Sequence, residues 1–238
     1  MKIATNHKII KRNSRIGQIT SLSALGILAA GMYITFKMPD KVAYSLGALL
    51  FGFILSQVGM YFGNRWGRSP RPDEILDKNL KGLGRENTIY HYSTPTHHLL
   101  IGPAGIWVLL HYYQGGTISY EKNRWRHKGG GFIQGYLKLF GQENIGRPEL
   151  EGASEINSIN KFLKKELPDL ELPEISAVAI FSNPNVTLST TEAPIPAVTP
   201  KEFKEFVKQK AKTNSISPLT LKAIQDIFPK PDAESKKD

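Results

Sequence analysis

The sequence contains no cysteine. The chain therefore forms no disulfide bond and offers no thiolate to a metal ion, a composition that suits a reducing compartment. Charged residues are also missing from two long segments: residues 16–36 and 42–62 each run for 21 positions without Asp, Glu, Lys or Arg. A helix of a soluble protein normally keeps one polar face, and these segments keep none. Their composition argues against a soluble helical bundle.

Both segments have the length of a membrane span. A helix of 21 residues rises about 32 Å, which is enough to cross a hydrocarbon core of about 30 Å. The first segment is longer than the apolar core of a cleaved signal peptide, and the second follows it directly. We therefore expect a transmembrane helical hairpin at 16–62, with the lipid bilayer as its first partner.

Basic residues predict the orientation of this hairpin. Five of them precede the first span within residues 1–15, and Arg65, Arg68 and Arg71 follow the second, whereas the turn at 37–41 holds two Lys and one Asp. Basic residues favour the cytoplasmic side. The sequence therefore predicts a two-span protein of the cell membrane, with a basic cytoplasmic N-terminus and both termini in the cytoplasm.

Small residues within the spans suggest how the two helices meet. Ala48, Gly52 and Ser56 are four positions apart on the second span, and Gly26 and Ala30 repeat that spacing on the first. Small side chains at this spacing let two helices approach closely. We expect these two stripes to face each other.

The net charge of +10 is concentrated near the spans. Of the 31 basic and 21 acidic residues, nine basic and one acidic lie in residues 1–69, leaving 22 and 20 for the remainder. The excess belongs to the membrane-proximal part, where it follows from topology and from attraction to anionic lipid. The sequence thus gives only weak support for a nucleic-acid partner.

Residues 73–228 are long enough for one soluble domain, separated from the spans by a Gly/Pro/Arg-containing linker at 63–72. The polar tail at 229–238 is expected to be disordered. Hydrophobic periodicity, turn residues and capping residues predict helices at 73–82, 148–167, 200–212 (capped by Thr199) and 219–228, and strands at 88–92, 97–101, 106–112, 117–120, 124–127, 175–181 and 194–198. This order indicates an α/β fold, a mixed sheet with flanking helices.

One segment carries a family resemblance. It runs from His97-His98 through an apolar strand, the turn Gly102-Pro-Ala-Gly105 and a second apolar strand to His111-Tyr112 and Gly116. This resembles the nuclease-related domain (NERD) family of the PD-(D/E)XK nuclease-like superfamily. The resemblance covers residues 73–210, and it implies a restriction-endonuclease-like fold and a bacterial cytoplasmic domain.

The resemblance also implies where catalytic residues should stand. Counting outward from the turn, His97, Leu110 and Tyr112 occupy the hairpin positions where the superfamily carries Asp, Glu and Lys. Mg²⁺ requires hard oxygen ligands, which Leu lacks. Glu74 alone survives, at the position of an accessory helix carboxylate. We therefore expect no catalytic site and no cofactor.

Histidine offers another interpretation. Five of the six histidines fall between residues 91 and 127, and His98 and His111 share one face of the hairpin in diagonal positions. A third ligand is missing from that face, so we expect no metal site. Gly129-Gly130-Gly131 lacks the Lys-Ser/Thr of a phosphate-binding loop and is expected to be an ordinary loop.

Three functions remain open, and the first is favoured. In the first hypothesis, the domain is a pseudo-nuclease that acts as an interaction or scaffold module for a protein partner. Alternatively, it is a metal-dependent nuclease with a relocated site that uses Glu74 with Glu143, Glu149 or Glu151. The third hypothesis is a structural subunit of a membrane complex, whose spans make the partner contacts. The sequence therefore leans away from an enzyme.

Overall fold

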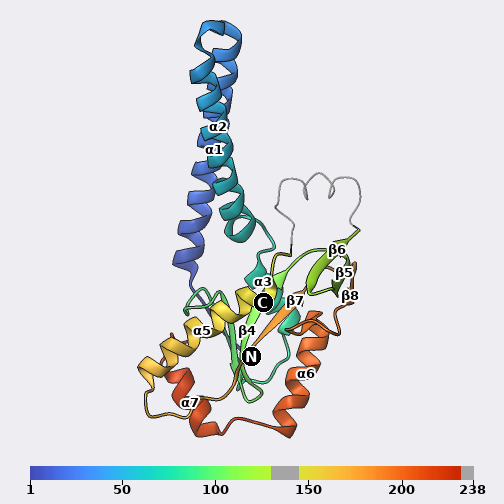
Figure 1. Ribbon diagram of the computed structural model, residues 1–238. Coiled ribbons are helices and arrows are strands. Elements are labelled where there is room, and N and C mark those ends of the chain that lie inside the picture. Colours follow the sequence, from blue (N-terminus) through green and yellow to red (C-terminus); the bar gives the residue numbers. More distant parts are fainter. Residues whose placement is uncertain (130–144, 232–238) are drawn as a thin grey trace. The chain divides into compact units, whose positions relative to one another are not determined.

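A computed structural model describes residues 1–129 and 145–231 of the 238-residue chain. The chain divides into two compact units, which Figure 1 shows with their secondary structure. One unit is Asn6–Glu74, and the other combines Met1–Thr5 with Ile75–Asp238. The expectations for Gly130, Gly131, Glu143 and most of the tail lie outside the described residues.

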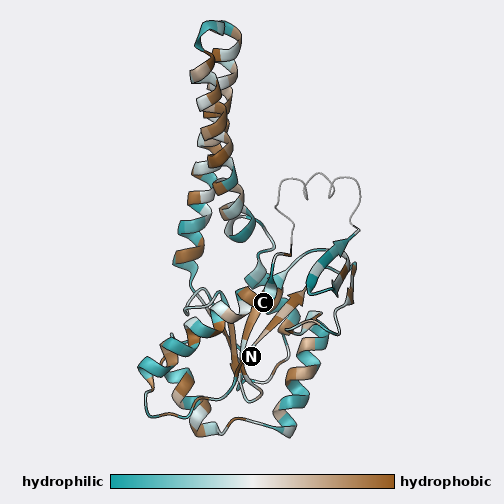
Figure 2. Ribbon diagram, viewed as in Figure 1, coloured by the Kyte–Doolittle hydropathy of each residue, from teal (hydrophilic) through white to brown (hydrophobic). Residues whose placement is uncertain are grey.

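The first unit is a helical hairpin. It consists of α1 (His7–Lys37), a short 3-10 turn (Pro39–Lys41), α2 (Val42–Phe62) and a π-helical turn (Gly63–Gly67), and it ends in the first residues of α3 (Pro72–Leu80). Two long apolar helices were expected here, and both are present. By length and composition they can cross a membrane, and Figure 2 shows their hydrophobic stretches. Helix α1 begins before the first predicted span, where Asn6 caps it by accepting a hydrogen bond from Ile9 N–H at 3.2 Å.

Small residues pack the two helices together, but with a different spacing from the expected one. The buried small residues recur every seven positions: Gly17, Ala24 and Gly31 on α1, and Ser45, Gly52 and Gly59 on α2. A seven-residue repeat keeps one stripe of each helix against its partner. Gly52 lies in this stripe as expected, whereas a side chain at Gly26 would meet no atom within 4 Å. The four-residue stripe on the first span therefore does not form the contact.

The second unit contains a six-stranded mixed sheet in the order β1-β2-β3-β4-β7-β9. Its strands are β1 (Lys2–Thr5), β2 (Thr88–His91), β3 (His98–Gly102), β4 (Gly105–Tyr112), β7 (Ile175–Phe181) and β9 (Ala197–Val198). Strands β2, β3 and β4 are antiparallel neighbours, and β7 runs parallel to β4. The predicted strand at 175–181 is confirmed at both ends.

Strand β1 was not expected from the sequence. It precedes α1, yet it pairs in parallel with β2, so that Ile3 lies opposite Ile89 and Ala4 opposite Tyr90. Ala4 is 2% exposed and belongs to the core of this unit. The helical hairpin is therefore an insertion between two neighbouring strands of one sheet.

Helices cover both faces of this sheet (Figure 1). Helices α5 (Pro148–Glu166) and α7 (Pro218–Asp226) pack on one face, and α3 and α6 (Pro200–Thr213) pack on the other. The predicted cap of α6 is present: Thr199 and Glu202 form a capping box, in which each side chain accepts from the other residue's backbone N–H. The expected mixed α/β architecture is thereby confirmed.

A second, three-stranded sheet has the order β6-β5-β8. Strands β5 (Gly116–Glu121) and β6 (Arg124–Lys128), both of which were predicted, pair in antiparallel. Strand β8 (Val186–Ser189), which was not predicted, adds parallel to β5. One face of this sheet packs on β7 through Ile118 and Phe181. Its other face is polar.

Candidate functional site

The β3–β4 hairpin has the register that the sequence predicted. Ile101 lies opposite Ile106 and Leu99 opposite Val108, and the ladder closes at Gly102 and Gly105 around a two-residue turn. Gly105 has a φ of 122°, a conformation that favours glycine. Side chains alternate between faces, so that Leu110 belongs with Val108 to the core beneath α5.

Leu110 lies inside this core. Its side chain is 3% exposed, and α5 comes close to the sheet at Gly152. A Cβ atom on Gly152 would lie 2.8 Å from the Cβ of Ala177 and 3.6 Å from Leu110 Cδ1. Only glycine lets the helix approach so closely, and the approach seals Leu110 in hydrocarbon.

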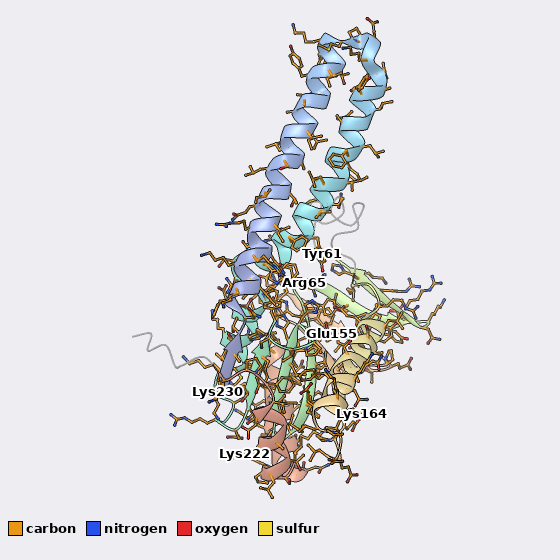
Figure 3. All side chains as sticks on the ribbon, turned by 90° about the vertical axis from the view of Figure 1, so that its left-hand side faces the viewer. Tyr61, Arg65, Glu155, Lys164, Lys222 and Lys230 are labelled. Atoms are coloured by element: carbon orange, nitrogen blue, oxygen red, sulfur yellow. The ribbon has the colours of Figure 1, made fainter. Side chains whose placement is uncertain are left out.

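His97 and Tyr112, the other two hairpin positions, both bond to α5. His97 Nδ1 lies 2.5 Å from Glu155 Oε1, and the Tyr112 hydroxyl donates to Glu151 Oε2 at 3.0 Å. Glu151 and Glu155 are one helical turn apart and therefore share a side of α5. We call His97, Tyr112, Glu151 and Glu155 the α5 cluster; Figure 3 labels Glu155. The structure thus brings two of the three predicted positions to one helix.

Glu155 is the most enclosed member of the α5 cluster. Its side chain is 12% exposed, whereas that of His97 is 38% exposed. Within the described part of the chain, Glu155 Oε2 is buried and has no hydrogen-bond partner. With the proton on His97 Nδ1, that ring donates to the Glu155 carboxylate. The pair has the orientation of a histidine positioned by a carboxylate.

Glu149 anchors the start of α5. Its carboxylate accepts from Trp125 Nε1 at 2.8 Å and from Arg147 Nε at 3.0 Å. Partial burial acts to raise the pKa of Glu149, but hydrogen bonds from its own backbone, Trp125 and Arg147, with the charge of Arg147, outweigh burial and lower that pKa. Glu149 is thus occupied in joining α5 to β6.

Glu74 belongs to the helical unit. Its Oε2 accepts from the backbone N–H of Arg71 at 3.0 Å, and its Oε1 pairs with the Arg71 guanidinium at 2.8 Å. The same guanidinium holds the buried Asp73 with two hydrogen bonds of 3.0 and 3.1 Å. Both carboxylate oxygens of Glu74 are therefore bonded at the start of α3.

His98 and His111 lie on the opposite face of the sheet from the α5 cluster and bond to different partners. His98 Nδ1 lies 2.8 Å from His91 Nδ1, and His91 Nε2 lies 3.0 Å from Asp77 Oδ1. His111 Nε2 instead lies 2.7 Å from the Ser182 hydroxyl. Residues 1–129 and 145–231 contain no group of three or more His, Cys, Asp or Glu side chains arranged to hold a metal ion.

Sequence reasoning missed Glu155 and Asp77, the partners of His97 and His91. Glu155 directly precedes Ile156, which packs against the core. This position next to an inward-facing residue was the one signal that Glu155 could lie close to the sheet. Asp77 directly follows the buried Leu76, yet nothing in the local sequence relates it to a strand 14 residues away.

Comparisons with known proteins found no matching family model, no matching curated protein and no matching solved structure. The resemblance to nuclease-related domains therefore depends on the residues of the hairpin and on the order of the elements.

Proposed function

We propose that this protein is a membrane-anchored, NERD-like pseudo-nuclease that serves as an interaction or scaffold module. The order of its elements supports the resemblance: α3 precedes the hairpin, and α5, β7, β9 and α6 follow it in the expected sequence. The Gly102–Gly105 turn and the register beyond it also agree with the pattern. A restriction-endonuclease-like arrangement is part of this proposal.

The proposal depends on the side chains at the three positions His97, Leu110 and Tyr112. Leu110 is enclosed by hydrocarbon, and His97 and Tyr112 bond to Glu155 and Glu151. A metal-dependent nuclease needs carboxylate oxygens that are free to hold Mg²⁺ and to activate water. Here Glu155 and Glu151 each accept a hydrogen bond, from His97 and from Tyr112 respectively.

We further propose that both ends of the helical hairpin face the cytoplasm. Strand β1 precedes the hairpin and β2 follows it, and the two pair in one sheet. A chain that crosses the bilayer twice between paired strands has both ends on the same side. The basic residues at both ends favour the cytoplasmic side, in a bacterial cell membrane by family resemblance.

Nuclease assays on the full chain test this function. The chain, purified in mild detergent, is incubated with Mg²⁺ or Mn²⁺ and with single- and double-stranded DNA and RNA. We expect no cleavage above a metal-free control. Metal-dependent cleavage that disappears in Glu151→Gln or Glu155→Gln would overturn the proposal.

A relocated nuclease site is the second candidate. Glu151 and Glu155 project from one side of α5, and the unpartnered Oε2 of Glu155 favours this alternative. Two of the acids expected for such a site are engaged elsewhere: Glu74 bonds Arg71, and Glu149 bonds Trp125 and Arg147. Glu143 lies outside the described residues. Calorimetric titration with Mn²⁺ distinguishes the candidates, since a relocated site requires binding that Glu155→Gln weakens.

A structural role in a membrane complex is the third candidate. Side chains at Gly26 and Gly47 would meet no atom within 4 Å, so these positions leave open small-residue surface on both helices. Such surface accommodates a further transmembrane helix. Association with a partner that survives removal of residues 75–238 would favour this role over the soluble module.

A further inference from the structure

One face of the three-stranded sheet consists of cations and hydroxyls. The register places Arg124 opposite Glu121, Arg126 opposite Ser119 and Lys128 opposite Thr117. Strand β8 extends this face with two more hydroxyls, because Thr187 lies beside Thr117 and Ser189 beside Ser119. We call these eight residues the cationic face: Thr117, Ser119, Glu121, Arg124, Arg126, Lys128, Thr187 and Ser189.

The opposite face of the same strands explains why the cationic face points outward. Ile118 is fully buried, and Trp125, Val186 and Leu188 pack around it. Strict alternation along each strand then directs the charged and hydroxyl residues away from this core. Seven of the eight residues are exposed, and Ser119 on the central strand is 5% exposed. The aromatic rings lie on the buried side, so the cationic face has none for stacking.

Positive charge exceeds negative charge on this face, with Arg124, Arg126 and Lys128 against Glu121. Glu121 is the only acid among the described residues of the three strands, and its nearest contact with Arg126 is 3.9 Å. Arg124, Arg126 and Lys128 recur every second residue, about 7 Å apart along an edge strand. The adjoining turn adds Lys122, which is held with Asn123 at φ values of 51° and 59°. Cations and hydroxyls in this arrangement suit a surface that carries many phosphates.

The chain keeps this unit close to the bilayer that the proposed function assumes. Asn6 alone separates β1 from α1, and residues 68–71 alone separate the π-helical turn from α3. The helical stretch from His7 to the first predicted span at Ile16 adds about 14 Å. This short tether gives the unit a high effective concentration at the bilayer, so a basic surface on it can come within the short range of the headgroup attraction.

We propose that the cationic face docks on the anionic headgroups of the membrane that anchors the chain. This inference depends on the membrane anchor of the proposed function and is independent of its lack of nuclease activity. The contact is with headgroups, since the cationic face carries no large apolar side chain to insert. Docking would orient the soluble unit and set which of its other surfaces meets a partner.

The absence of native cysteine makes the test direct. A fluorophore is attached to Ser189→Cys in the full chain, which is reconstituted in nanodiscs containing phosphatidylcholine with a nitroxide on its headgroup. We expect quenching to rise at least about twofold when about one third of the lipid is phosphatidylserine. About 0.5 M salt should reverse the rise, because the headgroup attraction is screened. Equal quenching in neutral and anionic discs would overturn the proposal.

Charge reversal supplies the matched comparison. Arg124→Glu/Arg126→Glu/Lys128→Glu should abolish the rise in quenching, whereas Lys161→Glu/Lys164→Glu/Lys165→Glu, the same charge change on exposed positions of α5, should leave it intact. Loss of the rise in both variants would contradict a specific face. The salt response of the labelled chain that keeps Arg124, Arg126 and Lys128 supports or refutes docking independently of how either charge-reversed variant folds.

Two further readouts separate this inference from its alternatives. Co-migration of the labelled chain with the discs tests whether the chain is anchored in the membrane. A chain that does not co-migrate would refute the proposed membrane anchor as well as docking of the cationic face. Fluorescence polarisation of a labelled oligonucleotide in neutral discs reports nucleic-acid binding. Oligonucleotide binding that is lost in the Arg124/Arg126/Lys128 variant, without lipid-dependent quenching, would assign the face to nucleic acid and overturn lipid docking.

Discussion

His97 Nδ1 lies 2.5 Å from Glu155 Oε1, although 58 positions separate the two residues in the chain. This contact joins the residue that directly precedes β3 to α5. Glu155 supplies the carboxylate from the helix, and His97 supplies its partner from the segment that leads into the strand.

We predict that His97→Ala destabilises the soluble unit by about 2 kcal/mol, because it leaves the enclosed Glu155 carboxylate without its partner. Tyr112→Phe, which removes an exposed hydrogen bond to the neighbouring Glu151, should cost about 0.5 kcal/mol. Denaturant unfolding of the full chain in detergent measures both. Equal losses would show that enclosure of the carboxylate is unimportant.

The helical hairpin should tolerate a large residue at Gly47 and reject one at Gly59. A Cβ on Gly59 would lie 2.9 Å from the backbone nitrogen of Ser21, whereas a Cβ on Gly47 meets nothing within 4 Å. We expect Gly59→Leu to destabilise helix pairing by about 2 kcal/mol and Gly47→Leu to change it by less than about 0.5 kcal/mol. Unfolding in increasing dodecyl sulfate, followed by circular dichroism, provides the comparison. A larger loss at Gly47 would contradict the seven-residue interface.

Strand β1 should stabilise the soluble unit. In one version, a Gly/Ser linker joins Met1–Thr5 to residues 72–238. Its free energy of unfolding should be about 2 kcal/mol higher than that of residues 72–238 alone, because β1 covers the exposed edge of β2. In the linked version, Ala4→Asp should remove this gain because Ala4 is buried, and Lys2→Ser should not because Lys2 is exposed. Urea unfolding compares the four proteins, and identical midpoints with and without β1 would refute its contribution.

Tyr90 should make the soluble unit sensitive to alkali. Burial raises the pKa of Tyr90 from 10.0 to about 12, with Asp226 adding to the effect and a hydrogen bond with Thr88 opposing it. The folded state therefore keeps the phenol proton after the unfolded chain has lost it. The free energy of unfolding therefore keeps the full contribution of Tyr90 below pH 10. It falls by about 3 kcal/mol in total as the pH rises from about 10 to about 12.

Tyr90→Phe isolates this contribution. The variant keeps a ring against Phe228, whose centroid lies 5.1 Å from that of Tyr90, and it removes the ionisable hydroxyl. We expect a shallower decline of unfolding free energy above pH 10 than in the parent chain, measured by urea titrations at a series of pH values. Parallel declines would exclude Tyr90 as a source of alkaline instability.

The sequence determined features that depend on neighbouring residues. Two uncharged stretches predicted the long apolar helices, and the turn residues at 102–105, between two apolar strands, predicted the hairpin and its register. Thr199 followed by Pro200 predicted the start of α6. Each signal is contained in a short segment, where capping, turn geometry and periodicity act locally.

Tertiary structure alone decided the features that join distant segments. Residues 2–5 become a strand because β2, more than 80 positions away, offers its edge, and β8 forms because β5 does the same. The interface between α1 and α2 uses Gly17, Ala24 and Gly31, which are seven residues apart. Gly26 is equally small but faces away from α2, and only the packing of the two helices decides between these positions. Glu155 reaches His97 only after α5 has packed on the sheet. Such pairings depend on the closing of long loops and on shared burial, which no local pattern encodes.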